Sequence, residues 1–303
     1  MYDVIIVGGG PAGLSAAIYS ARAGKSTLLI EKSICGGQIV NSPKVENYPG
    51  LPNVSGYELS AALYEQASSF GCEMHFDEVV EIKDLGEVKR IKTTASAFEA
   101  KAVIVATGAF NRKLGIDREA ELIGRGVSYC ATCDGSFFRG KSVAVVGGGN
   151  TALDDALYLS DICSEVVLIH RRDEFRGNPQ TLERLRGRDN VRIKTGYVVS
   201  ALSGSPRLES ITLSPVNGAE NAAETVAVSG VFIAIGTVPD TKSFSGLIAS
   251  DEAGYFTSDE SCKTNVPGIF VAGDCRAKEV RQLATAASDG VVAALAAIAY
   301  ITK

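Results

Sequence analysis

Two cysteines separated by two residues are the first candidates for chemistry in this chain. Cys130 and Cys133 lie in the segment "YCATCDG", where an acid, Asp134, directly follows the second thiol. A C-x-x-C pair can ligate zinc, form a static disulfide, or act as a redox dithiol that opens and closes in each turnover. The rest of the chain must distinguish among these three uses.

An internal repeat supplies the elements that would position such a pair. "GGGPAGLSAAIYSARAGKSTLLIEK" begins at Gly8, and "GGGNTALDDALYLSDICSEVVLIHR" begins at Gly147. A short apolar strand precedes each segment, a helical pattern follows the glycines, and a second apolar strand ends it. The repeat predicts two βαβ units, and therefore an α/β fold with two Rossmann-like dinucleotide-binding domains on parallel central sheets.

The glycines of each repeat have the spacing of a dinucleotide fingerprint. Gly8 permits a tight turn, Gly10 lets the backbone approach a pyrophosphate, and Gly13 allows the helix to pack closely on the strand. The phosphates then lie at the helix N-terminus, where unpaired N–H groups and the helix dipole favour negative charge. Two copies predict two bound dinucleotides. The matching residues of the second copy are Gly147, Gly149 and Ala152.

The residues that end each second strand distinguish the two ligands. Glu31 ends the first copy, and a carboxylate there accepts hydrogen bonds from a ribose diol and repels a 2′-phosphate. The second copy instead has His170, Arg171, Arg172 and, one helical turn on, Arg176. Guanidinium groups bind a 2′-phosphate through charge-assisted hydrogen bonds. The first site is therefore predicted to take FAD or NAD and the second NADP(H). A solvated charged face is the alternative for the arginines.

A further acid follows a buried strand near the C-terminal end of the chain. Asp274 comes after "GIFVAG" and precedes a long helical pattern. An acid in this place can bind the polyol chain of a cofactor, or it can cap the helix.

The composition disfavours several functional classes. The net charge of −5 disfavours a nucleic-acid partner. We expect no membrane partner, because no apolar run approaches the ~18–20 residues that cross a bilayer, and "VVAALAAIAYI" is typical of a buried helix. The opening strand leaves no basic leader, which predicts a cytoplasmic protein. Seven scattered cysteines do not resemble a secreted disulfide framework, and a reducing cytosol disfavours a static disulfide.

The residue types present also disfavour zinc. A zinc site needs about four ligands, usually from two cysteine pairs, whereas this chain has one C-x-x-C and two histidines, His75 and His170. We therefore expect no metal and assign the pair to redox chemistry. A nearby acid must then protonate a leaving thiolate, and Asp134 is the best candidate, with capping of the following segment as the alternative.

With these motifs in this order, the chain resembles the low-molecular-weight bacterial thioredoxin reductases over essentially its whole length. The shared landmarks are "GGGPAG", "CGGQ", "VENYPG", "ATG", "CATCDG", "GGGNTA", "HRRDEFR" and "GIFVAGD". The place of "CATCDG" between the two fingerprints is the most specific of them. The resemblance implies a homodimeric flavoprotein disulfide oxidoreductase that passes electrons from NADPH through FAD and the cysteine pair to thioredoxin.

The resemblance also implies a domain organisation. An NADPH-binding domain, residues 114–243, carries the dithiol and is inserted into an FAD-binding domain formed by residues 1–113 and 244–303. The nicotinamide and the dithiol share the inserted domain, and each must reach the flavin. We therefore expect this domain to rotate on connections near residues 112–117 and 240–247.

Individual roles follow from the same resemblance. Cys133 would lie against the flavin, Cys130 would attack the protein substrate, and Asp134 would handle the proton. Glu31 would hold the adenosine ribose of FAD. The residues implied for the FAD site are Gly8, Gly10, Pro11, Ala12, Gly13, Glu31, Lys32, Gly37, Gln38, Asn47, Gly108, Asp274, Arg281 and Gln282. Those implied for the NADPH site are Gly147, Gly149, Asn150, Thr151, His170, Arg171, Arg172 and Arg176.

The chain departs from the family pattern in a few places. Gly177 and Pro179 stand where a plainer helix start is expected, and Thr237 stands where relatives often carry histidine. Cys35 and Cys275 are additional thiols near the expected FAD site. These departures affect the strength of the NADPH preference more than the central assignment.

Other functions remain as alternatives on the same fold. One is a flavin-dependent oxidase of small-molecule dithiols, which the arginine cluster disfavours because an oxidase needs no 2′-phosphate clamp. Another is a reductase of a different small redox protein. A third is a flavin-binding redox sensor without turnover, which the complete cysteine pair and both fingerprints disfavour.

Overall fold

The computed structural model describes residues 1–216 and 223–303 and divides the chain into two compact units. The first unit consists of Met1–Phe110 and Val238–Lys303, and the second unit, Asn111–Thr237, is inserted between these parts. Strand β7 (Ala109–Asn111) leads into the second unit, strand β16 (Thr237–Pro239) leads back, and the two strands pair. The units therefore meet a few residues earlier along the chain than the boundaries expected after residues 113 and 243.

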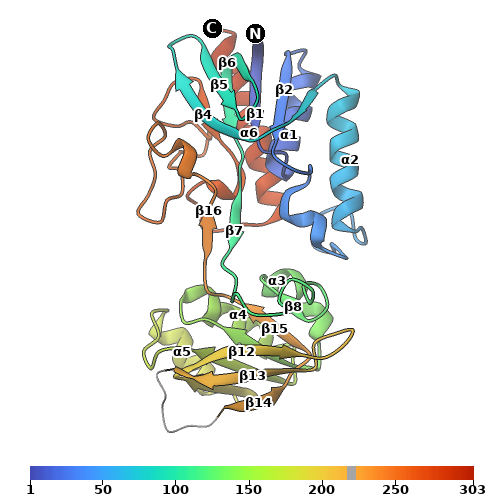
Figure 1. Cartoon of the computed structure of the whole chain (residues 1–303), viewed down its shortest axis with the longest axis vertical. Helices are drawn as coiled ribbons and strands as arrows, with labels where there is room; N and C mark the ends of the chain where they lie inside the picture. The colour runs from blue at the N-terminus through green and yellow to red at the C-terminus, as the bar shows by residue number, and fades with distance from the viewer. Residues whose placement is uncertain (217–222) are drawn as a thin grey trace. The chain divides into compact units, whose positions relative to one another are not determined.

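The first unit contains a seven-stranded sheet in which β3, β2, β1 and β6 are parallel neighbours (Figure 1). Strand β6 is long enough to pair with antiparallel β5 along its first half and with parallel β17 along its second half. The strands are β1 (Tyr2–Val7), β2 (Thr27–Glu31), β3 (Glu73–Phe76), β4 (Val79–Asp84), β5 (Lys89–Thr93), β6 (Ala97–Val105) and β17 (Ile269–Val271).

Both faces of this sheet are covered, which explains why its central strands are apolar without alternation. One face packs against the helices α1 (Pro11–Arg22), α2 (Gly56–Ser69) and α6 (Leu283–Ile301). The other face packs against apolar residues of the segment 244–275, such as Phe244 and Phe256. Short 3-10 helices η1 (Gly37–Asn41), η4 (Lys242–Phe244) and η5 (Gly273–Cys275) complete the unit.

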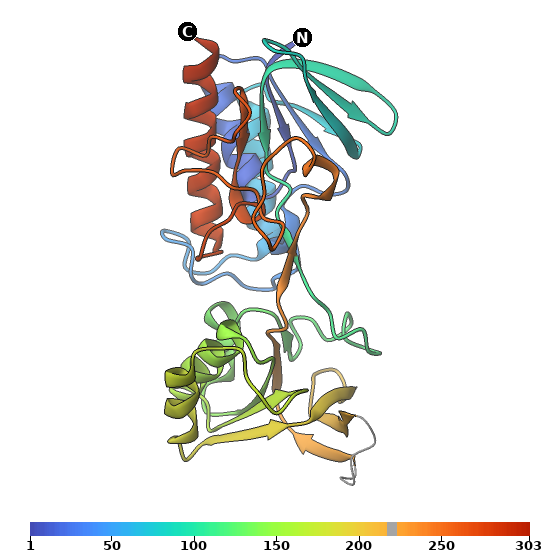
Figure 2. The ribbon, with the colours of Figure 1, turned by 90° about the vertical axis from the view of Figure 1, so that its left-hand side faces the viewer.

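Helix α6 contradicts one expectation from the sequence, because it is long and apolar enough to cross a membrane by length and composition alone. Core helices of water-soluble domains pass the same test. In the structure α6 lies along α1, as Figures 1 and 2 show. A Cβ added to Gly290 would lie 2.0 Å from the carbonyl oxygen of Ala12. The small residues of α6 thus permit a close helix–helix contact, as expected of a core helix.

The second unit contains a five-stranded parallel sheet in the order β11-β10-β9-β15-β8 and a three-stranded antiparallel sheet in the order β12-β13-β14. Its strands are β8 (Val127–Ser128), β9 (Ser142–Val146), β10 (Glu165–His170), β11 (Val191–Thr195), β12 (Tyr197–Ser203), β13 (Ser210–Pro215), β14 (Glu224–Ala227) and β15 (Gly230–Ile233). Its helices are α3 (Ala131–Asp134), η2 (Gly135–Phe138), α4 (Asn150–Ser160) and α5 (Pro179–Arg186). The predicted α/β fold and its two βαβ units, β1-α1-β2 and β9-α4-β10, are confirmed.

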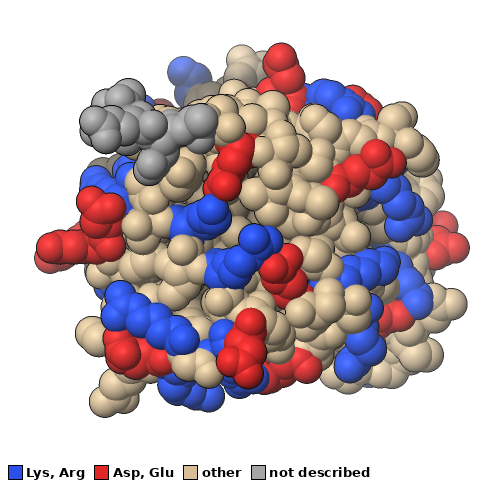
Figure 3. All heavy atoms as spheres, turned by 90° about the horizontal axis from the view of Figure 1, so that it is seen from below, with Lys and Arg blue, Asp and Glu red and all other residues tan. Residues whose placement is uncertain are grey.

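Charged side chains of both signs are interspersed on the second unit. Figure 3 shows Lys and Arg alternating with Asp and Glu over the face drawn. Some of them form exposed ion pairs, such as Arg186 with Glu183 and Arg192 with Glu165. Exposed pairs of this kind contribute little to stability, so they mainly keep the surface hydrated.

Candidate active site and nucleotide sites

The glycines of the first loop have the geometry that their predicted roles require. Gly8 has a φ of 106°, and a Cβ on it would lie 2.4 Å from the carbonyl oxygen of Ala106. A Cβ on Gly13 would lie 1.8 Å from the oxygen of Gly8, so only glycine permits this contact between helix and strand. A Cβ on Gly10 would meet nothing within 4 Å. The start of α1, with Pro11 in its first turn and no side-chain cap, is therefore approachable by a ligand.

Glu31 closes this loop from the end of β2. Its Oε2 accepts a hydrogen bond of 2.7 Å from the Gly9 N–H, and its Oε1 accepts one of 3.0 Å from the Ser33 N–H. The carboxylate is thereby held at the edge of the loop, where a ribose is predicted. Next to it, burial and the charge of Glu31 raise the pKa of the Cys35 thiol to about 11.

The extra thiols near this site are poor nucleophiles, because the reactive form of cysteine is the thiolate. Cys35 is buried, and its raised pKa leaves it protonated at neutral pH. Cys275 is fully buried, and burial likewise raises its pKa. Neither thiol is suited to take part in disulfide exchange.

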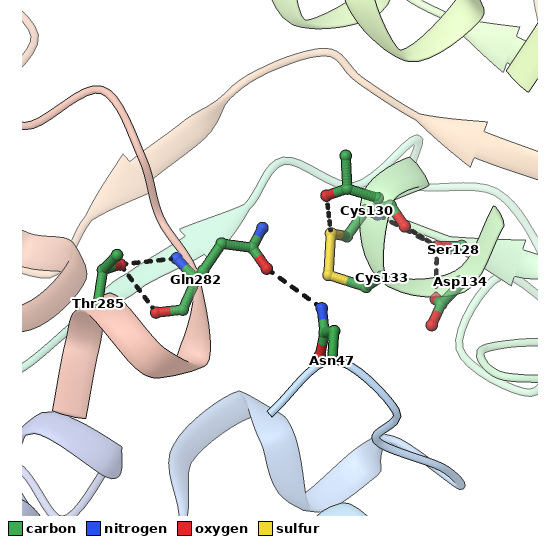
Figure 4. Close-up of a disulfide and its surroundings, with 8 residues drawn as sticks. Asn47, Ser128, Cys130, Cys133, Asp134, Gln282 and Thr285 are labelled. Atoms are coloured by element: carbon green, nitrogen blue, oxygen red, sulfur yellow. Dashed lines mark hydrogen bonds between the residues drawn. A yellow bond between two sulfur atoms is a disulfide. The ribbon is translucent and has the colours of Figure 1, made fainter. Parts of the chain in front are cut away.

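The other residues predicted for FAD lie in the first unit, in segments that neighbour the loop or flank α6. A Cβ on Gly37 would lie 3.3 Å from the Cα of Gly10, so this segment packs on the loop. The Gln38 amide donates to the carbonyl oxygen of Ala109. The Asn47 amide donates to Oε1 of Gln282 over 3.3 Å, and Figure 4 shows this pair with Thr285, which accepts from the Gln282 N–H. Lys32 pairs with Asp240 at 2.7 Å, and Gly108 follows β6 with a φ of 75°.

Asp274 has a buried oxygen that accepts no hydrogen bond from the described residues of the chain. Its Oδ1 is buried and has no hydrogen-bond partner among the described residues, since Lys278 Nζ lies 3.8 Å away. Burial raises the pKa of its carboxyl group against the opposing effect of Lys278 and Arg281. Arg281 stacks at 4.0 Å over the ring of Tyr255 and donates to the Asp274 carbonyl oxygen. An orphaned buried acceptor of this kind fits a hydroxyl group of a ligand.

The second glycine loop repeats the geometry of the first. A Cβ on Gly147 would lie 2.3 Å from the oxygen of Ala234, whereas one on Gly149 would meet nothing within 4 Å. Gly149 caps α4 without a side-chain hydrogen bond, and Thr151 lies exposed in the first turn of this helix. The start of α4 is therefore also approachable by a phosphate.

His170 is buried under the second glycine loop. Its side chain is only 6% exposed, and a Cβ on Gly148 would lie 2.2 Å from its ring. Burial lowers the pKa of the imidazole, so the ring is neutral at pH 7. The structure thus favours His170 as a support for the loop, and its neutral ring is not an anion-binding cation like the arginines.

The three arginines of the cluster are exposed and form no ion pair with the residues that the structure describes. Arg176 differs from the prediction, because it does not lie one helical turn on from Arg172: helix α5 begins only at Pro179, with Asn178 as its cap. The Arg176 N–H instead donates to the Gly148 oxygen over 2.8 Å. Backbone contact with the loop, not a helix, places this guanidinium.

Gly177 makes that contact possible. A Cβ on it would lie 2.5 Å from Leu153 Cδ1 and 3.0 Å from the carbonyl carbon of Gly149. The segment is further held by Asn150, whose Oδ1 accepts from the Asn178 N–H over 2.8 Å. The glycine that departs from the family pattern therefore lets the arginine segment lie directly on the second glycine loop.

Cys130 and Cys133 form a disulfide around the short helix α3 in the second unit, with their Cα atoms 5.3 Å apart (Figure 4). Within the described part of the chain, no group of three or more His, Cys, Asp or Glu residues is arranged to hold a metal ion. The other described cysteines are free and buried. The pair is thus closed in this structure, in the oxidised form of a redox dithiol.

Asp134 follows the disulfide and is held by a serine. Ser128 Oγ donates to Oδ2 of Asp134 over 2.6 Å, and Figure 4 shows this bond beside the disulfide. Burial raises the pKa of the Asp134 carboxyl group, and the hydrogen bond from Ser128 opposes that rise. The carboxylate does not cap the 3-10 helix that begins at Gly135, so the capping alternative is wrong. A carboxyl group with a raised pKa is suited to exchange a proton near neutral pH.

A second network, which the sequence did not reveal, holds the loop that leads to the cysteines. Glu119 is 3% exposed and has no cationic partner among the described residues. Its carboxylate accepts hydrogen bonds from the Leu114 N–H (2.9 Å), the Gly115 N–H (2.8 Å) and the Tyr129 hydroxyl (2.7 Å). The residue before Cys130 is thereby tied to the chain segment that enters the second unit.

We expect Glu119→Ala to destabilise the second unit by about 3 kcal/mol, because it removes a buried carboxylate that accepts hydrogen bonds from the Leu114 N–H, the Gly115 N–H and the Tyr129 hydroxyl. Urea denaturation followed by circular dichroism would measure the loss. Glu121→Ala is the matched control, since Glu121 is exposed and forms an ion pair with Arg118 on the surface, and it should change little. Equal midpoints for the two variants would contradict the role of the network.

Known proteins are similar to this chain over its whole length. Residues 2–290 match the family model described as pyridine nucleotide-disulphide oxidoreductase. The thioredoxin reductases of Listeria innocua and Bacillus subtilis are each 43% identical over 100% of this chain, which corresponds to 95% and 96% of their own lengths.

Solved structures agree with these relatives. The thioredoxin reductase of Streptococcus pyogenes is 38% identical, with a TM-score of 0.95 over 100% of this chain and 98% of that chain. The thioredoxin reductase of Lactococcus lactis in its FR conformation is 40% identical, with a TM-score of 0.68 over 100% and 99% of the two chains. The chain therefore belongs to the pyridine nucleotide-disulphide oxidoreductase family, in the branch that contains the thioredoxin reductases.

Proposed function

We propose that the chain is a thioredoxin-disulfide reductase that uses NADPH and FAD. The observation that carries this proposal is the disulfide of Cys130 and Cys133 beside the buried acid Asp134, in a unit that also contains an arginine-lined dinucleotide fold. The identity to thioredoxin reductases over the whole chain supports thioredoxin as the substrate.

The residues of the first unit fit FAD. The open start of α1 at Gly10 suits a pyrophosphate, Glu31 suits the adenosine ribose, and the orphaned Oδ1 of Asp274 suits a hydroxyl of the ribityl chain. Gln282 and Asn47 supply amide groups near the start of α6. When bound, FAD would carry two electrons between NADPH and the disulfide.

The residues of the second unit fit NADPH. The open start of α4 at Gly149 suits the pyrophosphate, and the exposed guanidinium groups of Arg171, Arg172 and Arg176 suit the 2′-phosphate. This arrangement favours the reductase over the dithiol oxidase, which needs no phosphorylated nicotinamide.

The reduced cysteine pair performs the exchange with the substrate. The Cys130 thiolate attacks one sulfur of the thioredoxin disulfide, which forms a mixed disulfide and releases one thioredoxin thiolate. The Cys133 thiolate then attacks the Cys130 sulfur, which releases the second thioredoxin sulfur and closes the disulfide again. Overall, the dithiol gives two electrons and two protons to thioredoxin. The proton that each cysteine loses when it becomes a thiolate is returned to one of the two released thioredoxin thiolates, and Asp134 would accept and deliver one of these protons.

We expect Asp134→Asn to lower kcat for thioredoxin reduction about 100-fold, because an amide of the same shape cannot exchange a proton. In the unaltered protein, kcat should decline at alkaline pH when Asp134 loses its proton, because its pKa is raised. In Asp134→Asn this decline of kcat should be absent. Steady-state kinetics with thioredoxin across the pH range would measure both effects. A variant with the full rate and an unchanged profile would remove Asp134 from the mechanism.

Hydrogen bonds restrict the residues that could serve as pivots for a rotation of the second unit. Glu119 holds Leu114 and Gly115 within the second unit. In the first unit, the Asp240 N–H donates to the Gly108 oxygen over 3.0 Å. The pivots would thus lie at the paired strands β7 and β16, a few residues earlier along the chain than the connections expected near residues 112–117 and 240–247.

Solved relatives support such a rotation. The Lactococcus lactis enzyme is slightly more identical to this chain than the Streptococcus pyogenes enzyme, yet its TM-score is 0.68 against 0.95. These two relatives therefore differ from each other in whole-chain arrangement. A tether between the units that left thioredoxin turnover unimpaired would contradict the rotation.

Rapid mixing tests the proposed function directly. NADPH should bleach the flavin absorbance of the purified protein, and oxidised thioredoxin should restore it. Restoration by oxygen and small dithiols alone would indicate the oxidase, and a response only to another redox protein would indicate a different substrate.

We further propose a cytoplasmic homodimer, in keeping with the free buried thiols and with the family resemblance.

A further inference from the structure

Ser128 is placed by the sheet rather than by a loop. It is the last residue of β8, it pairs in register with Phe232 of β15, and it is 4% exposed. Side chains on a paired strand are held more precisely than those on loops. Its hydroxyl is therefore a fixed group beside the redox pair.

One hydroxyl connects the nucleophile with the acid. Ser128 Oγ donates to Asp134 Oδ2 over 2.6 Å, a length typical of a hydroxyl that donates to a carboxylate. The same oxygen accepts from the Cys130 N–H over 3.1 Å. The carbonyl oxygen of Cys130 lies farther from it, at 3.3 Å, and a serine has only one proton to donate. The proton therefore belongs to the bond with Asp134.

We propose that Ser128 is a positioning residue for proton transfer: it occupies Oδ2 of Asp134, so that Oδ1 carries the proton exchanged with the cysteine pair. Oδ1 has no hydrogen-bond partner among the described residues of the chain. A backbone hydrogen bond also joins the two residues directly: the Asp134 N–H donates to the Cys130 carbonyl oxygen over 3.1 Å. Acid and nucleophile are thus fixed to the same strand end. This inference rests on the proposed function of Asp134.

The sign of the effect follows from the bond. A donor to the carboxylate favours the ionised form, whereas burial favours the protonated form. Ser128 therefore keeps the pKa of Asp134 below the value that burial alone would produce. Without the hydroxyl, Asp134 would keep its proton to a higher pH.

Other ionisable groups near α3 lie on α4 and after η2. Helix α4 packs against α3 and carries Asp154, Asp155 and Tyr158, and Arg139 and Lys141 follow η2. Burial, followed by the charge of Asp154, raises the pKa of Asp155 to about 7. A carboxyl group with such a pKa could produce a decline like that of Asp134 in a pH profile, so Asp155→Asn is a necessary control.

The test is the pH profile of kcat for thioredoxin reduction in the FAD-loaded protein. Ser128→Ala should move the alkaline decline upward by about one pH unit, the shift expected from one lost hydrogen bond to a charged group. Ser128→Thr, which keeps a hydroxyl, should show the decline at the same pH as the unaltered protein. Ser164→Ala, an exposed serine of the same unit, and Asp155→Asn should leave the decline in place.

A second readout does not depend on turnover. The infrared carbonyl band of protonated Asp134, identified by its absence in Asp134→Asn, should titrate at a higher pH in Ser128→Ala. Ser128→Cys keeps the shape of the side chain but has a weaker hydrogen-bond donor, so the carbonyl band of Asp134 should again titrate at a higher pH. This variant replaces Ser128→Ala in the test if the alanine variant is unstable. Ser128→Ala should not alter the profile of Asp134→Asn when the two are combined.

The outcomes separate the two proposals. If Asp134→Asn abolishes the decline and Ser128→Ala leaves it unmoved, Ser128 has no such role and the function of Asp134 stands. If the decline survives Asp134→Asn, the proton role of Asp134 fails and the role of Ser128 fails with it. A shift with Ser128→Ala that Ser128→Thr reverses supports the inference.

Discussion

Cys130→Ser and Cys133→Ser should each lower NADPH-dependent reduction of thioredoxin by at least about 10³-fold, the scale of loss when a catalytic nucleophile is removed. A hydroxyl at either position cannot form the disulfide that the structure shows. In the proposed mechanism, a serine at position 130 would remove the sulfur that attacks the substrate. A serine at position 133 would remove the sulfur that resolves the mixed disulfide, so that the exchange would stop before thioredoxin is released.

Insulin reduction coupled to thioredoxin would measure this loss, with NADPH consumption as the readout. Cys133→Ser should in addition accumulate a covalent complex with thioredoxin, visible on a non-reducing gel. Cys163→Ala is the matched control, because Cys163 is the other cysteine of the second unit and burial raises its pKa to about 11. Either serine variant with more than a tenth of the normal rate would overturn the assignment of the pair.

Replacing Arg171, Arg172 and Arg176 together by alanine should raise KM for NADPH about 100-fold and leave KM for NADH nearly unchanged. Each charge-assisted hydrogen bond to a phosphate contributes about 1.5–3 kcal/mol, so the loss of two or more bonds accounts for a change of this size. NADH lacks the 2′-phosphate, so its KM does not depend on these hydrogen bonds.

The chain offers a control with the same change in charge. Arg186, Arg188 and Arg192 belong to the same unit and pair with acidic residues on its surface. Their triple replacement should leave KM for both nucleotides unchanged. A rise in KM for NADPH in this control would indicate a general electrostatic effect, and an equal rise for NADH in the first variant would contradict a 2′-phosphate site.

The two glycine loops show how much of the local structure a sequence pattern predicts. Gly8, Gly10 and Gly13 lie within six residues of one another, and the structure gives each the turn, opening or close contact that its spacing predicts. The pattern could not show that Arg176 lies off the helix. That placement depends on Gly177 lying against Leu153, which is a contact between distant elements.

The surroundings of Asp134 show the opposite case. Asp134 could be proposed as the acid because it follows the cysteines directly in the sequence. Its partner could not, since a serine two residues before a cysteine has many other uses. Only the pairing of β8 with β15 buries Ser128 and turns its hydroxyl toward the carboxylate. The same holds for Glu119, which meets Tyr129 through the packing of its loop.

By itself, the sequence determined the two βαβ units, the redox pair between them and the opposite charges at the two strand ends. These features are set by glycine spacing, apolar periodicity and neighbouring residues, which act over a few turns of chain. The tertiary structure alone decided that His170 is a buried neutral support, that α1 is the helix along which α6 packs, and that Ser128 holds Asp134. Burial and hydrogen-bond direction depend on which surfaces meet, and that is a property of the packed chain.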